Sequence, residues 1–443
     1  MKKTDLYLKF GTYVKASSAD GDIQGISLEN FVVSVLNNPT CCPKPPGSPN
    51  GMLMTALALY PTLQTVTDFL GNSSAIQLST LRLGVKSDSS VTTQTSSVIQ
   101  STTTNANLVI APNGTGALVA NIPDGTATGG NARGANAVDF QMSRYNNAQV
   151  ASGANSFVGG GANNRATGVT SACAGGDNNF ANGLRSFVGA GLNNSATGSE
   201  SVIVGGNGNA ASGTQSLSGG SLNTASGVQS IALGSGQVAN NAQSVCIGLG
   251  PSTASGQASV VLGYGNHATE FGSMALCNGS MSYLTSQVSI ASGTFSGFPG
   301  ERGEAQQSLL TARRLASLNS GATAVLSLNG TGVTNLLIPN GNNRLWAVKV
   351  FATAFVSVAG GTLVLGDSYM GEYTLLFKKV GGVSSVVGVN AGNIIYDTNM
   401  VTAAFTFAAG ASQDLQITFK APTTASATTF RCVARVELTE VAY

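Results

Sequence analysis

The sequence predicts a fibrous all-β protein in which a parallel β-roll, a form of β-solenoid, is followed by a C-terminal β-sandwich. Three observations predict it: a repeat of about 14–15 residues across residues 151–280, the glycine-rich corners of that repeat, and a change to strands alternating with turns after residue 305. A fixed short period is typical of a solenoid in which one repeat forms one turn. The chain has 443 residues, enough for several domains.

The repeat is marked by serines, each of which opens a short apolar run, as in Ser259-Val-Val-Leu-Gly. An Ala-(Thr/Ser/Asn)-Gly corner precedes the next serine, and Asn241 and Glu270 replace its glycine in two copies. The runs are too short for helices, and Gly and Asn tolerate the positive φ that tight corners need. Each repeat therefore predicts one coil with two short strands, and stacked coils rise by ~4.8 Å per turn. The repeat serines are Ser156, Ser171, Ser186, Ser201, Ser216, Ser230, Ser244, Ser259 and Ser273.

The apolar runs do not alternate with polar residues, as Val202-Ile203-Val204 shows. In a strand, the residues one and three places after the serine point to one face, and the residue two places after it points to the other. Both faces therefore favour burial, although a thin coil can enclose only one of them. No charged residue occurs between Glu200 and Glu270, and a solvated surface of that length rarely lacks charge. We expect a parallel homotrimer whose solenoids pack along a shared axis.

The repeat Ser-(apolar)-(small)-(apolar)-Gly with Ala-Ser-Gly corners resembles the head repeats of trimeric autotransporter adhesins, and the same left-handed β-roll occurs in bacteriophage fibre proteins. Phrases beginning at Asn105 and Asp124 are similar to those that precede the roll in phage fibres. The sequence from Gly303-Glu-Ala-Gln-Gln-Ser to Val433-Ala-Arg-Val-Glu-Leu is similar to a domain that follows such rolls in phage tail fibres. The resemblance implies architecture and trimerisation, but no ligand.

Five regions are predicted along the chain. Residues 1–76 are expected to be a small α+β region that attaches to other virion proteins, and residues 77–150 a β-rich shaft with a hairpin around Pro112-Asn-Gly. The roll follows at residues 151–280. Residues 281–304 form a neck with Gly-X-Y triplets from Gly297 onward, for which a short triple-stranded clamp is the alternative. Residues 305–443 are expected to form a sandwich of roughly eight strands, which is the tip.

Composition excludes several classes of function. Charged residues make up 9% of the chain and the formal net charge is +2, so nothing in the overall charge favours nucleic acid as a partner. No apolar run approaches the ~20 residues of a membrane helix, and the N-terminus lacks the apolar core of a signal peptide. We therefore expect a virion protein made in a host cytoplasm, without membrane insertion. The six cysteines are scattered, Cys173 and Cys246 fit a core, and one histidine cannot supply a metal cluster, so no metal or cofactor is expected.

Motifs that could carry chemistry have a structural alternative in each case. Gly206-Asn-Gly208-Asn-Ala-Ala211 matches a dinucleotide-binding pattern, but no helix follows it to hold a pyrophosphate. His267 could join a serine triad, yet it occupies a repeat corner where other copies carry Asn or Ser. Carboxylates could form an acid pair for glycan cleavage, although no spacing fixes such a pair and a solvated role is favoured. These carboxylates are Asp177, Glu200 and Glu270 in the roll and Asp367, Glu372 and Asp397 in the tip.

Two further features concern recognition. The pairs Asn163-Asn164, Asn178-Asn179 and Asn193-Asn194 recur one turn apart, and we expect amide ladders that satisfy corner backbone groups rather than a glycan or ion site. Trp346 lies within a predicted strand, where core packing is favoured and a receptor contact by stacking on a sugar is the alternative.

The sequence thus predicts a homotrimeric structural fibre of a bacteriophage virion, preferably a tail fibre, which adheres to a glycan or protein of the host surface and is not an enzyme. Three identical tips would gain avidity when presented together. The alternatives are a head or neck decoration fibre without a ligand, a bacterial surface adhesin, and a glycan-degrading tail spike.

Overall fold

The computed structural model describes residues 6–7, 13–18, 21–27, 110, 112, 114–293, 303, 305–332 and 343–442. The chain divides into two compact units, Met1–Leu108 and Val109–Tyr443. In the first unit, the described strands β1 (Leu6–Tyr7), β2 (Tyr13–Ser18) and β3 (Gly21–Ser27) form an antiparallel sheet in that order. The rest of the attachment region, the first limb of the hairpin around Pro112 and nearly all of the Gly-X-Y triplets lie outside the described residues. The residues that follow Pro112 include β4, which pairs in parallel with the solenoid strand β5.

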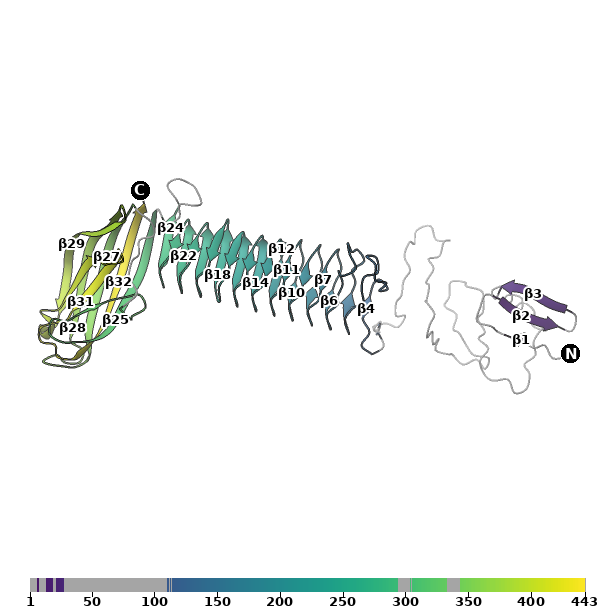
Figure 1. Cartoon of the computed structure of the whole chain (residues 1–443), viewed down its shortest axis with the longest axis horizontal. Helices are drawn as coiled ribbons and strands as arrows, with labels where there is room; N and C mark the ends of the chain where they lie inside the picture. Colours follow the sequence, from purple (N-terminus) through teal and green to yellow (C-terminus); the bar gives the residue numbers. More distant parts are fainter. Residues whose placement is uncertain are drawn as a thin grey trace, which may run out of the picture. The chain divides into compact units, whose positions relative to one another are not determined.

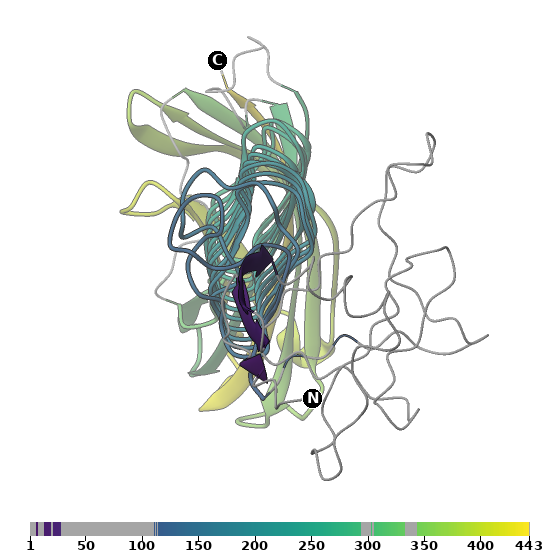
Figure 2. The same cartoon turned by 90° about the vertical axis from the view of Figure 1, so that its right-hand side faces the viewer.

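The second unit confirms the all-β prediction and the parallel solenoid (Figure 1). Within its described residues, the only helical segment is the 3-10 turn η1 (Thr398–Met400). From β6 to β23 each coil of the solenoid contributes one strand to each of two parallel sheets, and the coils superimpose when viewed along the stack (Figure 2). From β6 onward, strands of neighbouring coils pair 14 or 15 residues apart, for example Ala232 with Cys246 and Val188 with Ile203.

The first solenoid sheet contains β4 (Leu118–Val119), β5 (Val138–Asp139), β6 (Phe157–Val158), β8 (Ala172–Cys173), β10 (Phe187–Val188), β12 (Val202–Asn207), β14 (Leu217–Ser221), β16 (Ile231–Ser235), β18 (Val245–Leu249), β20 (Val260–Tyr264), β22 (Met274–Asn278) and β24 (Val288–Ser292). The second contains β7 (Arg165–Ala166), β9 (Phe180–Ala181), β11 (Ser195–Ala196), β13 (Ala210–Ala211), β15 (Thr224–Ala225), β17 (Gln237–Ala239), β19 (Ser252–Ala254), β21 (His267–Ala268) and β23 (Met281–Ser282).

The interior of the solenoid is a narrow column of small apolar side chains. One side is the residue two places after each repeat serine, such as Ile203 and Cys246, and the other is the corner alanine, such as Ala211 and Ala254. All of these side chains are fully buried. Because two sheets this close leave room for one small side chain from each, larger residues are confined to the outside. The prediction that Cys173 and Cys246 are core residues is confirmed, and burial raises their thiol pKa values to about 12 and about 11.

Side-chain hydrogen bonds hold the corners together. In five of the nine repeats the serine Oγ donates back across the corner, as Ser201 does to the carbonyl of Gly198 at 2.8 Å, whereas the Oγ atoms of Ser186, Ser216, Ser230 and Ser259 are buried without a hydrogen-bond partner. The two asparagines of a pair have different roles. Asn178 takes the left-handed backbone conformation, at φ 55°. Asn179 is buried, and its side-chain amide donates to the carbonyls of Gly175 and Gly191. The predicted amide ladders are therefore present.

The buried ladder continues through successive coils, because from Asn164 to Asn223 each side-chain carbonyl accepts the backbone N–H of the next member, whereas the side-chain carbonyl of Gln237 accepts the Cys246 thiol. In place of asparagine, Gln237 supplies a longer amide, and Ser252 supplies a hydroxyl. Its members are Asn164, Asn179, Asn194, Asn209, Asn223, Gln237, Ser252, Asn266 and Ser280.

The outward side of the first solenoid sheet is apolar along most of its length. Val204 is 60% exposed and Ile247 and Leu262 are also exposed, as expected for residues three places after the serine. The residues one place after the serine, such as Val202 and Val245, are half-buried beside them. We call this surface the outward apolar face. No residue that the structure describes covers the exposed side chains of this face, and the predicted trimer is a proposal considered below.

The C-terminal tip consists of two packed sheets, as the sequence predicted. A large antiparallel sheet contains β25 (Ala305–Leu318), β32 (Thr428–Ala442), β27 (Arg344–Val358), β28 (Ser368–Val380) and β29 (Val383–Tyr396) in that order. A smaller sheet contains β26 (Thr323–Val325), β31 (Leu415–Lys420) and β30 (Ala404–Ala409). Alternate residues of the large sheet pack inward on the small one, in a core that includes Trp346, Phe377, Phe419 and Phe430.

The tip is joined to the solenoid by the last coil. Strand β24 pairs antiparallel with the first residues of β25, from Gln306 to Leu309, so the first solenoid sheet continues into the large sheet of the tip. This pairing covers the otherwise open end of the solenoid and leaves the remainder of β25 to the tip alone. The five-region division predicted from the sequence stays a prediction.

Candidate functional site

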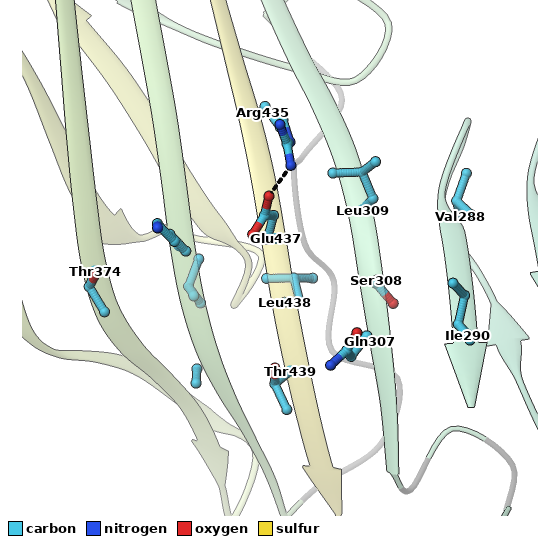
Figure 3. Close-up of a pocket in the computed structure, with 13 residues that line it drawn as sticks. Val288, Ile290, Gln307, Ser308, Leu309, Thr374, Arg435, Glu437, Leu438 and Thr439 are labelled. Atoms are coloured by element: carbon cyan, nitrogen blue, oxygen red, sulfur yellow. Dashed lines mark hydrogen bonds and ion pairs between the residues drawn. The ribbon is translucent and has the colours of Figure 1, made fainter. Parts of the chain in front are cut away.

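A groove of about 470 Å³ lies on the outer face of the large tip sheet, next to the last coil of the solenoid (Figure 3). Its sides come from β24, β25, β32, β27 and β28, so it forms only where the solenoid sheet continues into the tip. Apolar side chains lie on the solenoid side and polar ones on the tip side. The lining residues are Val288, Ile290, Gln307, Ser308, Leu309, Ala347, Val348, Lys349, Thr374, Arg435, Glu437, Leu438 and Thr439.

Strand alternation explains which side chains reach the groove. In β25 and β32 every second residue points to the core, so Leu309 and Glu437 point outward between buried neighbours. The antiparallel register sets Leu309, Glu437, Lys349 and Thr374 in one row across four strands. The groove is therefore a surface of side chains on a rigid sheet, without a loop that has to order first.

Charged pairs fix the polar side of the groove. Lys349 Nζ lies 2.7 Å from the carboxylate of Glu372, and Arg435 forms an ion pair with Glu437. Both cations also lie over the ring of Phe351, with Lys349 4.7 Å and Arg435 5.5 Å from its centroid. Exposed pairs of this kind add little to stability, but they hold donors and acceptors in place for a polar ligand.

The opposite face of the same sheet holds a buried polar network at the junction with the solenoid. Glu440 is buried, forms an ion pair with Arg344, and accepts hydrogen bonds from Gln306 Nε2 at 2.9 Å and Tyr283 Oη at 3.4 Å. Burial raises the pKa of the Glu440 carboxyl, although Arg344 opposes this shift. Burial, and the nearby Glu440 carboxylate, raise the pKa of Tyr283 well above its ordinary value. This network joins the last coil to β25, β27 and β32.

The structure places the predicted tip residues in structural positions. Trp346 is 1% exposed and packs against Phe377, so it lies in the core and could contact a receptor only if the sandwich opened. Asp367 accepts hydrogen bonds from the backbone of Val364 and from Asn399, and Asp397 accepts two from Ser368. Of the three tip carboxylates named from the sequence, Glu372 alone lies beside the groove, as the partner of Lys349.

The predicted solenoid residues are not brought together. Asp177 accepts from Asn163 and Glu200 accepts from Arg185 and Gln215, on different corners of the coils. His267 is half-buried in β21, paired in register with Thr253 and Met281. The Gly206–Ala211 motif spans the end of β12 and β13 with no helix after it. The exposed Glu270 replaces a corner glycine, and its backbone carbonyl accepts the Ser273 hydroxyl.

Among the described residues, no three His, Cys, Asp or Glu side chains cluster as metal ligands, and no helix is long and apolar enough to cross a membrane. Sequence reasoning missed Lys349, Arg435 and Glu437. Their signal was the alternation in Phe430-Arg-Cys-Val-Ala-Arg-Val-Glu-Leu, which places Arg431, Arg435 and Glu437 on one face of a strand. Lys349 could not be added because the pairing of β27 with β32 spans about ninety residues of sequence.

Neither known family models nor curated proteins match this chain. Solved structures that are similar to it are bacteriophage tailspike proteins. The tailspike of Acinetobacter phage vB_ApiP_P1 is 11% identical, covers 68% of this chain and 58% of its own, and has a TM-score of 0.23. The tailspike of Acinetobacter baumannii phage AM24 is 9% identical, and the match covers 64% of this chain and 53% of the tailspike, with a TM-score of 0.23.

A third similar structure is the tailspike protein gp49 from Acinetobacter baumannii bacteriophage Fri1, described as a capsular polysaccharide depolymerase. It is 11% identical, covers 65% of this chain and 62% of its own, and has a TM-score of 0.17. The chain thus spans between 53% and 62% of the length of these three structures. The prediction that the chain is not an enzyme is corrected by this finding, because the similar structures include a capsular polysaccharide depolymerase.

Proposed function

We propose that this chain is a fibre or spike protein of a bacteriophage tail, and that the outer face of its tip contacts a glycan on the host cell surface. The observation that carries the proposal is the groove on the tip sheet, where polar side chains from four strands converge beside an apolar wall. Polar groups on one side and apolar groups on the other suit a sugar, which has both kinds of surface. The solenoid beside it is a stiff stack of hydrogen-bonded coils.

The proposal includes three copies packed along the outward apolar face. Val204, Ile247 and Leu262 are exposed in the single chain, and exposed apolar surface of this extent usually marks an interface. Parallel packing would bring three grooves to the same end, where weak identical contacts gain avidity. Residues 1–76 are proposed to attach this assembly to other virion proteins.

The test is binding of the full-length chain to pairs of bacterial strains that differ only in their surface polysaccharide. The expected result is binding to at least one polysaccharide-bearing strain and none to its stripped partner. Gln307→Trp, which fills the groove, is expected to abolish binding, while Ser317→Trp, outward on the same strand and away from the groove, is expected to preserve it. Binding to no strain, or unchanged binding by Gln307→Trp, would contradict the proposal.

Cleavage of the bound glycan is the second candidate, favoured by the two carboxylates on this face. Glu437 lies on β32 and Glu372 on β28, with β27 between them and an offset of two residues along the strands, so about 12 Å separates their backbones. Inverting glycosidases place two carboxyl groups ~6.5–9.5 Å apart. Release of reducing ends from the polysaccharide that the chain binds, lost in Glu437→Gln and in Glu372→Gln, would establish cleavage. Binding without release of ends would restrict the function to adhesion.

A further inference from the structure

The outer face of the tip sheet, in the groove and along the strands beyond it, carries more positive than negative charge. Cross-strand register and alternation place Arg313 of β25, Arg431 and Arg435 of β32 and Lys349 of β27 on this face, with Glu372 and Glu437 among them. We call these six residues the cationic zone. Four cations against two carboxylates give it a formal net charge of +2, as large as that of the whole 443-residue chain.

Two of the four cations are free to meet a ligand. Lys349 and Arg435 are each paired with a carboxylate of the zone. Arg313 and Arg431 are exposed, and neither forms an ion pair with any described residue. A guanidinium presents its donors in a planar fork that matches a carboxylate or a phosphate, so an exposed, unpaired arginine is suited to an anionic group.

An exposed aromatic ring lies beside the free guanidinium. Phe355 is directly opposite Arg431 in the pairing of β27 with β32, and its side chain is 40% exposed. Leu315 is opposite Arg431 on the other side, in β25, and is also exposed. A sugar ring can pack its apolar face on Phe355 while an acidic substituent of the same ring reaches Arg431.

The cationic zone is distinct from the surface proposed for packing of copies. Strand β24 pairs with β25 only from Gln306 to Leu309, so the outward apolar face of the solenoid ends at the groove. Arg313 and Leu315 lie further along β25, where no solenoid strand follows. A second copy that docked the same zone onto this one would bring like charges together, which disfavours a copy as its occupant.

We infer that the cationic zone binds an anionic polysaccharide of the host surface, with a sugar ring on Phe355 and its carboxylate or phosphate at Arg431. This inference rests on the proposed function and names its ligand class. Specificity for acidic over neutral glycans comes from Arg431 and Arg313, whose charges form no ion pair with the tip residues that the structure describes.

The test uses the full-length chain on an array of acidic and neutral bacterial polysaccharides, at low and at high salt. We expect retention on acidic polysaccharides only, weakened by salt. Arg431→Gln is expected to lower affinity about tenfold, since one charge-assisted contact is lost, and Phe355→Ala to lower it further without changing the salt dependence. Arg185→Gln is the matched control, because it removes an exposed arginine of the solenoid that is paired with Glu200.

Four results would overturn the inference. The first is that neutral polysaccharides are retained as strongly as acidic ones, and the second is that Arg431→Gln binds with wild-type affinity. The third is that duplex DNA competes as strongly as the glycan does. The fourth is a changed assembly mass in Arg431→Glu, which would make the zone a contact between copies. Binding of the wild-type protein to whole bacterial cells tests the proposed function separately. If wild-type protein binds cells and Arg431→Gln binds them equally, this inference alone fails, whereas a wild type that binds no cells removes the proposed function.

Discussion

The solenoid and the tip each bury one face of a continuous sheet and leave the other open, but the two open faces differ in chemistry. On the solenoid, residues 201–269 contain no charged side chain, and Val204, Ile247 and Leu262 are exposed. On the tip, exposed apolar residues such as Val433 alternate with arginines and with ion pairs. Exposure of a charge-free apolar face to water is unfavourable, so this face favours packing against identical copies. A face that mixes apolar and charged side chains is stable in water and can stay exposed until a ligand binds.

The largest expected effect comes from charging the solenoid face. Ile247→Asp is expected to reduce the assembly to monomers of 44.4 kDa, because each unpaired charge buried at the interface costs about 3–5 kcal/mol. Val433→Asp makes a comparable change at a comparably exposed position of the tip and is expected to leave the assembled mass unchanged. Native mass spectrometry of both variants measures the assembled mass. A wild-type chain that is already monomeric would remove the proposed trimer.

A second test compares buried and exposed asparagines of the solenoid. Asn209 is buried and bonds to the carbonyls of Gly205 and Gly220 and to its ladder neighbours. Asn209→Ala is expected to lower the free energy of unfolding by about 2–4 kcal/mol, since it leaves several backbone groups without partners. Asn182→Ala, at a half-exposed corner, is expected to change it by less than about 1 kcal/mol. Equal losses in thermal unfolding would show that the ladder is not a special source of stability.

The third test concerns pH at the junction of the two regions. Burial raises the pKa of Glu440 above its ordinary value of 4.5, so the folded tip binds this proton more tightly than the unfolded chain does. This contribution is complete below about pH 4.5 and is lost as the pH rises through the folded pKa. A tenfold difference in proton affinity is worth about 1.4 kcal/mol. The melting temperature of wild type is expected to fall over this window relative to Glu440→Gln, and parallel curves for the two proteins would contradict the assignment.

The smallest expected effect is on the stability of the tip surface. Glu437→Gln removes the partner of Arg435 in an exposed ion pair, so the free energy of unfolding is expected to change by less than about 1 kcal/mol. Equilibrium denaturation measures this directly, and it serves as the control for loss of glycan cleavage in the same variant. A larger loss would mean that the pair supports the sheet, and that any loss of cleavage is a folding effect.

The architecture was predictable because its signals are local and repeated. The period of the serines predicts the length of one coil. The interior position of Ile203 and the outward position of Val204 follow from strand alternation alone. The tip sandwich followed from strands and turns, and the amide ladder from paired asparagines one turn apart. The side chains that form the groove could not be found in this way. They meet through the pairing of β25 and β27 with β32, which joins residues of distant sequence and has no local signature.

The change in the buried ladder has a mechanical consequence. From Asn164 to Asn223 each coil is tied to the next by an amide that donates to a backbone carbonyl of the next coil and accepts a backbone N–H of that coil. At Ser252 one short hydroxyl takes that place, accepting the backbone N–H of Asn266. A tensile load along the axis is therefore shared by fewer side-chain bonds in that coil than in any of the coils from 164 to 223. Under pulling, rupture is expected to begin near Ser252, on the tip side of the rod's middle, and to leave the N-terminal coils intact.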